Sequence, residues 1–451
     1  MKIKNLVEKA RIAQAFYEEN FDQRRTDEVV RAIAKVVYDN AERLARLAVD
    51  ETKMGVYEDK VSKCKGKSKG VWYNLKGKKS MGILEIDPET NLTLIAKPMG
   101  VVCGVIPMTN PVVTPMSKAM FALKTKNAII VSPHPKAKEC TGLTVKLIQE
   151  EIVKLGVPKD MIQVVEEPTL DDTLELMASV DVVLATGGMA MVKSAYSSGK
   201  PSYGVGAGNV QVILDRHIDY HEAAAKVIAG RKYDNGIICT GEQSFIYPRE
   251  NKEEVFKAFK DNGAYFVEGA DREKLASTLF IDGKINRDVV GQFPQKIADL
   301  AGIKVPADAK ILVMEAKGAG EADVICKEKM CPVMCCLPYD SFEEAIEIAR
   351  TNLKVEGRGH SCVIHSNDES HIIMVGSKVE VSRVIVNAVS ATTAGGAVGN
   401  GLAVTNTLGC GSWGNNSLSE NLTYKHLMNI TRVANPPAGV HIPTDEEIWA
   451  N

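Results

Sequence analysis

The sequence has no long apolar segment and almost no net charge. No run of residues approaches the ~20 apolar positions that a membrane-spanning helix needs. The first 22 residues carry charges of both signs, which is typical of an amphipathic helix and not of a signal peptide. A formal net charge of −2 leaves no broad basic surface for nucleic acid or anionic lipid. We therefore expect a cytoplasmic protein with no nucleic-acid or membrane partner.

The cysteines lack the spacing of a disulfide framework or of a metal site. Ten cysteines are scattered irregularly over 451 residues, a usage typical of reduced thiols in the cytosol. Four of them fall in "CKEKMCPVMCC" (326–336), but this segment contains no C-x-x-C pair. His217 and His221 lie four apart, yet Asp219 between them indicates the start of a helix. The sequence therefore predicts no metal ion.

Strands and helices alternate over most of the chain. Residues 1–80 have helical periodicity, and two apolar runs around "DPETN" predict a β-hairpin over residues 81–102. From residue 127 onward, short apolar strands alternate with helices, which is typical of parallel sheets covered by helices. A chain of this length is expected to form two or three domains. We place the main boundary near residue 226, with a return to the first domain after about residue 405.

Lysines cluster in "KCKGKSKG" (63–70) and "KGKK" (76–79). Runs of like charge usually form the solvated face of a helix or loop, and we favour that interpretation here. The alternative is a surface that receives a phosphorylated ligand.

A glycine pair stands where a predicted strand meets a predicted helix, in "VVLATGGMAMVKSA" (182–195). The free N–H groups and the dipole of a helix N-terminus favour a pyrophosphate, and Gly187 and Gly188 would let it approach the backbone. The full G-x-G-x-x-G pattern is absent, so an ordinary α/β turn is the alternative. The similar "GVGAGN" (204–209) precedes a strand and predicts a turn with glycines at positive φ.

Three residues are candidates for the chemistry. Cys239 in "GIICTGEQ" is followed by small residues that would leave its sulfur accessible to a carbonyl carbon, although free cysteine is more often buried. Asn110 in "MTNPV" is either a turn residue or an amide donor to an oxyanion. His360 in "EGRGH" is either structural or a proton acceptor for an incoming thiol.

Taken together, these segments resemble the aldehyde dehydrogenase superfamily and, within it, the branch that acylates coenzyme A. The matching order covers nearly the whole chain. It consists of "TNP" (109–111), "SPHPK" (132–136), "ATGG" (185–188), "GVGAGN", "DNGIICTGEQ" (234–243), "KEKMCPV" (327–333), "EGRGH" (356–360) and "TLGCGSWGNNSLSENLTYKHLMNI" (407–430).

The resemblance implies an α/β fold with two doubly wound domains and an oligomerisation hairpin. Residues 1–226, with the return after about 405 and the hairpin 81–102, would bind NAD(P). Residues 227–405 would form the catalytic domain that carries Cys239, and residues 420–451 would be a C-terminal oligomerisation segment. A homodimer or homotetramer is implied.

It also implies roles for single residues. Cys239 would be the nucleophile, Asn110 with the Cys239 backbone N–H would form the oxyanion hole, and His360 would assist deprotonation of CoA. Glu328 would hold the nicotinamide ribose. The remaining cofactor contacts would come from Ser132, Pro133, Lys136, Thr186, Gly187 and Gly188.

Two departures from the hydrolytic relatives are informative. Those relatives carry a glutamate that activates water where this chain has Gly204, so the acyl-enzyme here would wait for the thiol of CoA. They often carry a lysine near the adenosine ribose where this chain has Ser132. Because Lys136 lies close in sequence and could neutralise a 2′-phosphate, we expect NADP, with NAD also used.

Segments such as "YEDKV" and "SAYSSGKPSYGVGAGN" are similar to members that interconvert succinic semialdehyde and succinyl-CoA. The implied reaction is reversible and CoA-dependent, with reduction of succinyl-CoA as the expected physiological direction. A carboxylate needs a cationic or hydrogen-bonding partner. The candidates are Arg358, Ser244, Arg383, Thr392 and Thr393.

Two alternatives stay open. An acylating dehydrogenase for acetaldehyde or another short aldehyde would differ only in its pocket. A non-catalytic scaffold is disfavoured by the intact set of Asn110, Cys239 and Glu328. Because the chain stops at Asn451, we expect no iron-dependent alcohol dehydrogenase domain of the kind attached in bifunctional relatives.

Overall fold

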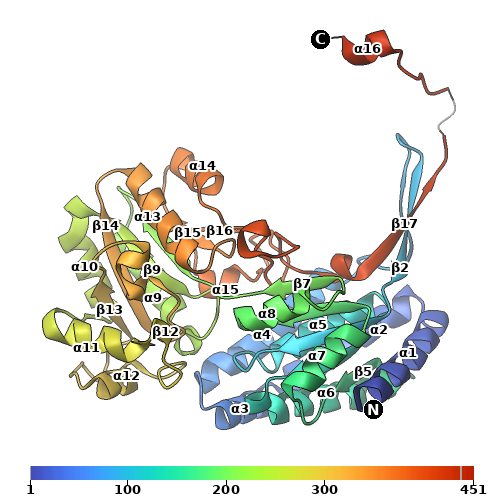
Figure 1. Cartoon of the computed structure of the whole chain (residues 1–451), viewed down its shortest axis with the longest axis horizontal. Helices are drawn as coiled ribbons and strands as arrows, with labels where there is room; N and C mark the ends of the chain where they lie inside the picture. Colours follow the sequence, from blue (N-terminus) through green and yellow to red (C-terminus); the bar gives the residue numbers. More distant parts are fainter. Residues whose placement is uncertain (1, 437–438, 451) are drawn as a thin grey trace.

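The computed structural model describes residues 2–436 and 439–450. Figure 1 shows two α/β lobes side by side and an arm that extends from the first of them. The chain forms the first lobe, crosses once into the second, and returns to the first near its C-terminal end. The α/β class with two parallel sheets, predicted from the sequence, is confirmed.

Four helices form the N-terminal part of the first lobe. The second of them begins after Asp22, whose carboxylate accepts a hydrogen bond from the backbone N–H of Arg25 at 2.8 Å and so caps the helix. Helix periodicity over residues 1–80 is therefore confirmed. The helices are α1 (Lys2–Asn20), α2 (Gln23–Asp39), α3 (Ala41–Thr52) and α4 (Tyr57–Leu75).

The first lobe contains a five-stranded parallel sheet in the order β5-β4-β3-β6-β7. Every residue of β3 and β4 is buried, as expected for central strands that are covered on both faces. The strands are β3 (Val101–Ile106), β4 (Ala128–Pro133), β5 (Ile162–Val164), β6 (Val182–Thr186) and β7 (Ser202–Val205), and the helices between and beside them are α5 (Val113–Lys124), α6 (Lys138–Val153), α7 (Leu170–Ser179) and α8 (Met189–Tyr196).

The second lobe contains a seven-stranded parallel sheet in the order β10-β13-β14-β9-β8-β15-β16. Its strands are β8 (Val210–Leu214), β9 (Glu242–Pro248), β10 (Ala264–Phe266), β13 (Ile311–Glu315), β14 (Val333–Tyr339), β15 (Cys362–His365) and β16 (Val384–Val386). Its helices are α9 (Tyr220–Lys232), α10 (Lys252–Asp261), α11 (Gly269–Leu279), α12 (Pro294–Ala301), α13 (Phe342–Val355), α14 (Glu369–Lys378) and α15 (Ser390–Thr393). A small hairpin joins β11 (Phe280–Ile281) to β12 (Lys284–Ile285).

The chain changes sheets earlier than the sequence predicts. Strand β7 closes the first sheet and β8 lies inside the second, so the crossing falls between Val205 and Val210 and not near residue 226. No helix separates these two strands, and strand–helix alternation therefore carries no signal for the change of sheet. The return is visible in the first core, which buries Val404, Leu422 and Leu427.

The arm is a three-stranded antiparallel sheet in the order β1-β2-β17 (Figure 1). Strands β1 (Gly82–Asp87) and β2 (Leu92–Pro98) form the predicted hairpin, but the hairpin ends at Pro98, because Val101 and Val102 already belong to buried β3. Strand β17 (Met428–Ala434) pairs with β2, and a last short helix, α16 (Asp445–Trp449), follows. Residues 437, 438 and 451 of the predicted segment 420–451 lie outside the described residues.

The described residues hold neither a helix suited to a membrane nor a cluster suited to a metal ion. None of the helices in residues 2–436 and 439–450 has the length and apolar character to cross a bilayer. The same residues contain no group of three or more His, Cys, Asp or Glu side chains placed to hold a metal ion.

Candidate active site

Cys239 lies in a tight turn between the 3-10 helix η3 (Tyr233–Gly236) and strand β9. All ten cysteines fall within the described residues, and nine of them are buried while Cys239 is partly exposed. Just before it, Asp234 and Asn235 both have a φ of 50°. Two consecutive non-glycine residues in the left-handed region are uncommon, and such strain is typical of functional segments.

The "GVGAGN" segment packs directly on this turn. A Cβ on Gly208 would stand 1.9 Å from the carbonyl oxygen of Cys239, so only glycine allows the close approach. The backbone N–H of Gly208 donates to Oε1 of Glu328 at 3.1 Å. Glycine is therefore required here by contact with the Cys239 backbone, which the sequence interpretation of a simple turn did not foresee.

Cys239 and Glu328 both have raised pKa values. Burial, followed by the carboxylate of Glu328 and the thiol of Cys410, raises the pKa of Cys239 to about 12, and the guanidinium of Arg383 opposes this. Burial and the neighbouring Glu356 raise the pKa of Glu328 to about 8. In the free protein the nucleophile candidate is therefore a thiol at neutral pH, and it has to lose a proton to react.

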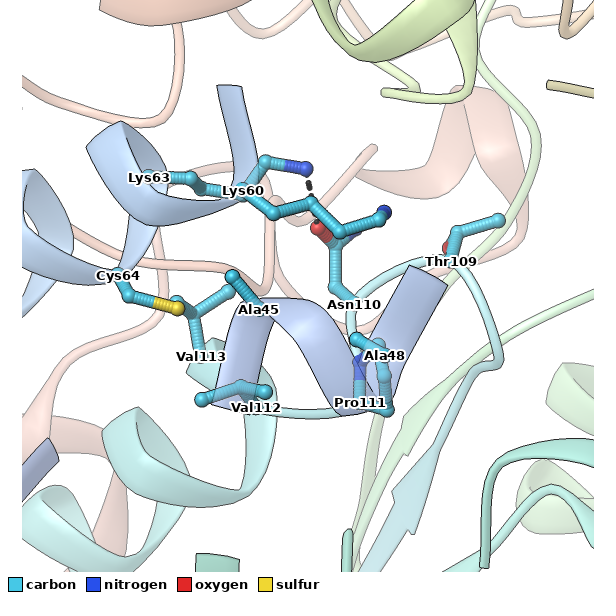
Figure 2. Close-up of a pocket in the computed structure, with 10 residues that line it drawn as sticks. All are labelled: Ala45, Ala48, Lys60, Lys63, Cys64, Thr109, Asn110, Pro111, Val112 and Val113. Atoms are coloured by element: carbon cyan, nitrogen blue, oxygen red, sulfur yellow. Dashed lines mark hydrogen bonds between the residues drawn. The ribbon is translucent and has the colours of Figure 1, made fainter. Parts of the chain in front are cut away.

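Asn110 lies in the loop between β3 and α5, on the first lobe, and Figure 2 shows it beside Lys63 of α4. The Lys63 ammonium donates to the Asn110 Oδ1 at 2.9 Å. No hydrogen bond within residues 2–436 and 439–450 uses the Asn110 Nδ2. The amide thus has a free donor group, as the proposed oxyanion role requires.

His360 is completely buried. Its Nδ1 lies 3.0 Å from the Ser361 hydroxyl, and its Nε2 has no hydrogen-bond partner in the described chain. Burial, helped by the nearby Arg383, lowers its pKa to about 3. The imidazole is therefore neutral at physiological pH and can accept a proton only transiently.

A cavity of about 580 Å³ opens between α4 and the α15 region. Its walls include Lys67, Tyr233, Thr392 and Ile238, the residue before Cys239. Lys67 donates to the carbonyls of Gly395 at 3.0 Å and Thr405 at 3.2 Å. Burial and the neighbouring Lys63 lower the pKa of Lys67 to about 8, and Cys239 acts in the opposite direction.

The lysines of α4 are therefore not simply a solvated face, which corrects the interpretation that we favoured from the sequence. Lys60 and Lys63 are buried, and Lys67 is partly buried. They stand at positions i, i+3 and i+7 of one helix and so share a face. That spacing was readable in the sequence, but a count of charges alone hides it.

Of the five residues predicted to bind the substrate carboxylate, the structure places only Thr392 on the cavity wall. Arg358 forms a two-pronged ion pair with Glu380, at 2.7 Å on each side. Arg383 is buried and donates to the carbonyls of His360 and Gly409 and to the Asn421 side chain. Thr393 donates to Val389 O, and Ser244 lies buried in β9, accepting from Cys335. Each of these four already has a protein partner and lies off the cavity wall, whereas Thr392 lies on the wall and its hydroxyl makes only a long hydrogen bond, at 3.4 Å, to Val389 O.

All of the predicted cofactor residues except Glu328, which lies in the second lobe before β14, are at the carboxyl edge of the first sheet. The strand order reverses at β3, with β4 and β5 on one side and β6 and β7 on the other. Ligands of such sheets bind outside the strand ends at this point. The loop after β3 carries Asn110, and the turn after β6 carries Gly187 and Gly188.

This edge fits a dinucleotide phosphate. A Cβ on Gly188, which caps α8, would meet nothing within 4 Å. The approach to the first N–H groups of that helix is therefore open. Thr186 ends β6, and Pro133 ends β4. Ser132 is buried, and its hydroxyl lies 2.8 Å from the hydroxyl of Thr173. Lys136 is exposed in the 3-10 helix η1 (Pro135–Ala137).

Gly204 lies in β7, where the hydrolytic relatives would carry a glutamate. A Cβ at this position would stand 2.6 Å from Val192 Cγ1 and 3.0 Å from Tyr196, both on α8. The packing thus leaves no room for a carboxylate side chain.

The model of the aldehyde dehydrogenase family matches residues 1–282 and 313–413. The chain therefore belongs to the aldehyde dehydrogenase family, as its motifs predict.

It is 54% identical over 450 residues to the succinate-semialdehyde dehydrogenase (acetylating) of Clostridium kluyveri, covering 100% of this chain and 99% of that protein. Among solved structures, it resembles an acetylating aldehyde dehydrogenase from Geobacillus thermoglucosidasius, with a TM-score of 0.94, 39% identity and 98% of each chain covered. It also resembles the propionaldehyde dehydrogenase of Rhodopseudomonas palustris with bound CoA and an acylated cysteine, with a TM-score of 0.86, 26% identity, and 96% of this chain and 97% of that chain covered.

Proposed function

We propose that this protein catalyses the reversible, CoA-dependent oxidation of succinic semialdehyde to succinyl-CoA, with reduction of succinyl-CoA as the physiological direction. The observation that carries the proposal is the partly exposed Cys239, whose neighbour Ile238 lines a cavity that also holds Lys67, in a site where Gly204 excludes a water-activating carboxylate. Without that base, the acyl group on Cys239 passes to a thiol and is not hydrolysed.

In the oxidative direction, the Cys239 sulfur adds to the aldehyde carbon, and the Asn110 Nδ2 with the Cys239 N–H stabilises the resulting oxyanion. The bound nicotinamide supplies the acceptor for the aldehyde hydrogen, which leaves as hydride. The proton of the Cys239 thiol passes to solvent as the sulfur adds, the oxyanion becomes a carbonyl as the hydride leaves, and a thioester remains on Cys239. The CoA sulfur then bonds to the acyl carbon, the bond to Cys239 breaks, and the proton of the CoA thiol passes through His360 to the Cys239 sulfur.

For the cofactor, Gly187, Gly188 and Glu328 would hold the pyrophosphate and the nicotinamide ribose, with Thr186, Pro133 and Ser132 shaping the strand ends around it. We propose NADP as the preferred cofactor, with NAD also used. The support is the exposed Lys136, which lies near His134 and Arg287. Burial lowers the pKa of His134, and the positive charges of Lys136 and Arg287 lower it further, which shows that the three basic groups are close together. A ribose phosphate would neutralise this local excess of positive charge.

For the substrate, Lys67 replaces the arginines as the partner of the carboxylate. Its ammonium already donates to two carbonyls, and a third N–H remains for a ligand in the cavity. Thr392, on the same wall, is the one sequence candidate that stays in this role.

We also propose a cytoplasmic homodimer or homotetramer that is held together by the arm and the C-terminal segment. The support is the exposure of Ile83 and Ile86 on β1 and of Ile442 and Trp449 near the C-terminus. Apolar groups gathered on a projecting element are typical of contact surfaces. Light scattering coupled to size exclusion would distinguish the dimer from the tetramer.

The first test follows oxidation of NADPH, and separately of NADH, with succinyl-CoA for the wild type and for Cys239→Ala. We expect the wild type to oxidise both reduced cofactors, NADPH faster than NADH, and the Cys239→Ala variant to oxidise neither. Turnover of acetyl-CoA without turnover of succinyl-CoA would instead favour an acylating acetaldehyde dehydrogenase. No turnover of either would contradict the enzymatic proposal.

A further inference from the structure

A buried charge cluster connects α4 to the turn that leads to Cys239. Asp234 is completely buried, and its Oδ2 accepts from Lys63 at 2.6 Å and from Lys60 at 3.0 Å. Its Oδ1 accepts from the backbone N–H of Val56 at 2.8 Å. Burial raises the pKa of Asp234, but the two ammonium groups outweigh it, so that the net shift is downward and the group is a carboxylate.

The surrounding backbone is shaped to fit this cluster. Asp234 is held in the left-handed region, and its backbone N–H donates to the Asp59 carboxylate at 2.8 Å. A Cβ on Gly55 would stand 2.0 Å from Asp234 Oδ1. Buried ion pairs rarely add much net stability, and their best-attested use is to fix one arrangement among several. Here the arrangement that is fixed is the turn just before the nucleophile.

Lys63 makes one contact that Lys60 does not. Besides Asp234, its ammonium donates to Asn110 Oδ1 at 2.9 Å (Figure 2). An ammonium has donors only, so it can bind the oxygen end of the amide but not the nitrogen end. Rotating the Asn110 amide by 180° would bring N–H groups against N–H groups. The ammonium therefore fixes which end of the amide points away from α4.

We propose that Lys63 is the positioning residue of the oxyanion site. It holds the Asn110 amide with Nδ2 turned toward the reacting carbonyl, and through Asp234 it holds the Cys239 turn in register with that amide. One ammonium thus aligns the oxyanion donor of the first lobe with the nucleophile of the second. The proposal rests on the roles of Asn110 and Cys239 given above.

The test compares Lys63→Met with Lys60→Met, each alone and combined with Asn110→Ala. Both lysines bind Asp234, but only Lys63 binds Asn110, so Lys60→Met is the matched control. Two reactions are measured: turnover of succinyl-CoA with NADPH, and acylation of Cys239 by p-nitrophenyl acetate, which needs neither cofactor nor CoA. Cys239→Ala gives the background of the second reaction.

Removing an oxyanion donor typically costs about 10²–10³ in rate, and disorienting one costs part of that. We expect Lys63→Met to lower kcat and the acylation rate roughly 10- to 100-fold while the KM for NADPH stays unchanged. In the Asn110→Ala background, the effect of Lys63→Met should shrink to that of Lys60→Met, because only the contact with Asp234 that the two lysines share remains. The effect of Lys60→Met itself should be undiminished. The proposal would be overturned if the rate loss caused by Lys63→Met were the same with and without Asn110→Ala. It would also be overturned if Asn110→Ala reduced the rate loss of Lys60→Met as much as that of Lys63→Met.

Lys63→Met leaves Asp234 with one fewer cation, which could prevent folding. In that case Lys63→Gln keeps an N–H donor for Asp234, and because its amide carries both a donor and an acceptor it no longer fixes which end of the Asn110 amide faces α4. The same comparison in the Asn110→Ala background then applies. Wild-type protein that is acylated by the ester at Cys239 but does not turn over any acyl-CoA would contradict the proposed function and leave the test of Lys63 intact. Wild-type protein without ester acylation at Cys239 would overturn both.

Discussion

Replacing Lys67 with methionine should remove the preference for a substrate that ends in a carboxylate. The Lys67 ammonium lies in the wall of the 580 Å³ cavity, with two of its three protons on the carbonyls of Gly395 and Thr405. One charge-assisted hydrogen bond to the substrate is worth about 1.5–3 kcal/mol. The ratio of kcat/KM for succinyl-CoA to that for butyryl-CoA, which lacks the carboxylate, should therefore fall roughly 10- to 100-fold.

The ratio matters because the variant also leaves two carbonyls without their donor. That loss affects both substrates equally and cancels in the ratio. Lys69→Met is the matched control, since Lys69 lies on the same helix and lines the same cavity but is exposed. An unchanged ratio in Lys67→Met, or an equal drop in Lys69→Met, would refute the reasoning.

The same assay has a pH dependence of known sign. Burial and Lys63 lower the pKa of Lys67 to about 8, so the ammonium is present below pH 8 and is lost above it. The wild-type preference for succinyl-CoA should accordingly decline as the pH rises through 8, and in Lys67→Met the ratio should not change with pH.

Three further predictions test the rest of the site. Because burial and Glu328 raise the pKa of Cys239 to about 12, alkylation of its peptide by iodoacetamide in the free enzyme should rise roughly tenfold per pH unit between about pH 7 and 10; a plateau near pH 8 would contradict this. Lys136→Ala should raise the KM for NADPH several-fold without changing the KM for NADH, and an equal effect on both would exclude a 2′-phosphate contact. Gly208→Ala should lower the melting temperature and abolish Cys239 acylation, because its Cβ would overlap the Cys239 carbonyl. The control is Gly142→Ala on α6, where the added Cβ would meet nothing within 4 Å. This variant should instead stabilise the protein by about 0.4–1 kcal/mol.

The fold was predictable because buried parallel strands are apolar throughout and alternate with helices. Strands such as β4, with the sequence "AIIVSP", show this directly. The change of sheet was not predictable by the same rule, because β7 and β8 follow one another without a helix. Membership of a strand in one sheet or the other is decided by long-range pairing, which local periodicity does not encode.

Site residues were predictable where a short motif specifies the residue type. They were not predictable where a hydrogen-bond partner elsewhere in the chain decides whether a side chain is free to bind a ligand. Asn110 and Cys239 stand in short motifs, and the structure leaves both with groups free for chemistry. Arg383 and Arg358 looked equally available, but distant residues occupy their guanidinium groups. Lys67 was overlooked for the opposite reason, since in a run of lysines only helical phase separates the inward residue from the outward ones.

The packing around Gly204 limits how this enzyme could change during evolution. A side chain there would press on Val192 and Tyr196 of α8, the helix that starts at Gly188 and presents its N-terminus to the proposed cofactor site. A single substitution to glutamate would therefore displace the same helix that we propose to hold the cofactor. Conversion to a dehydrogenase that hydrolyses its acyl-enzyme would require α8 to be repacked first, so the two catalytic types are separated by several concerted changes and not by one.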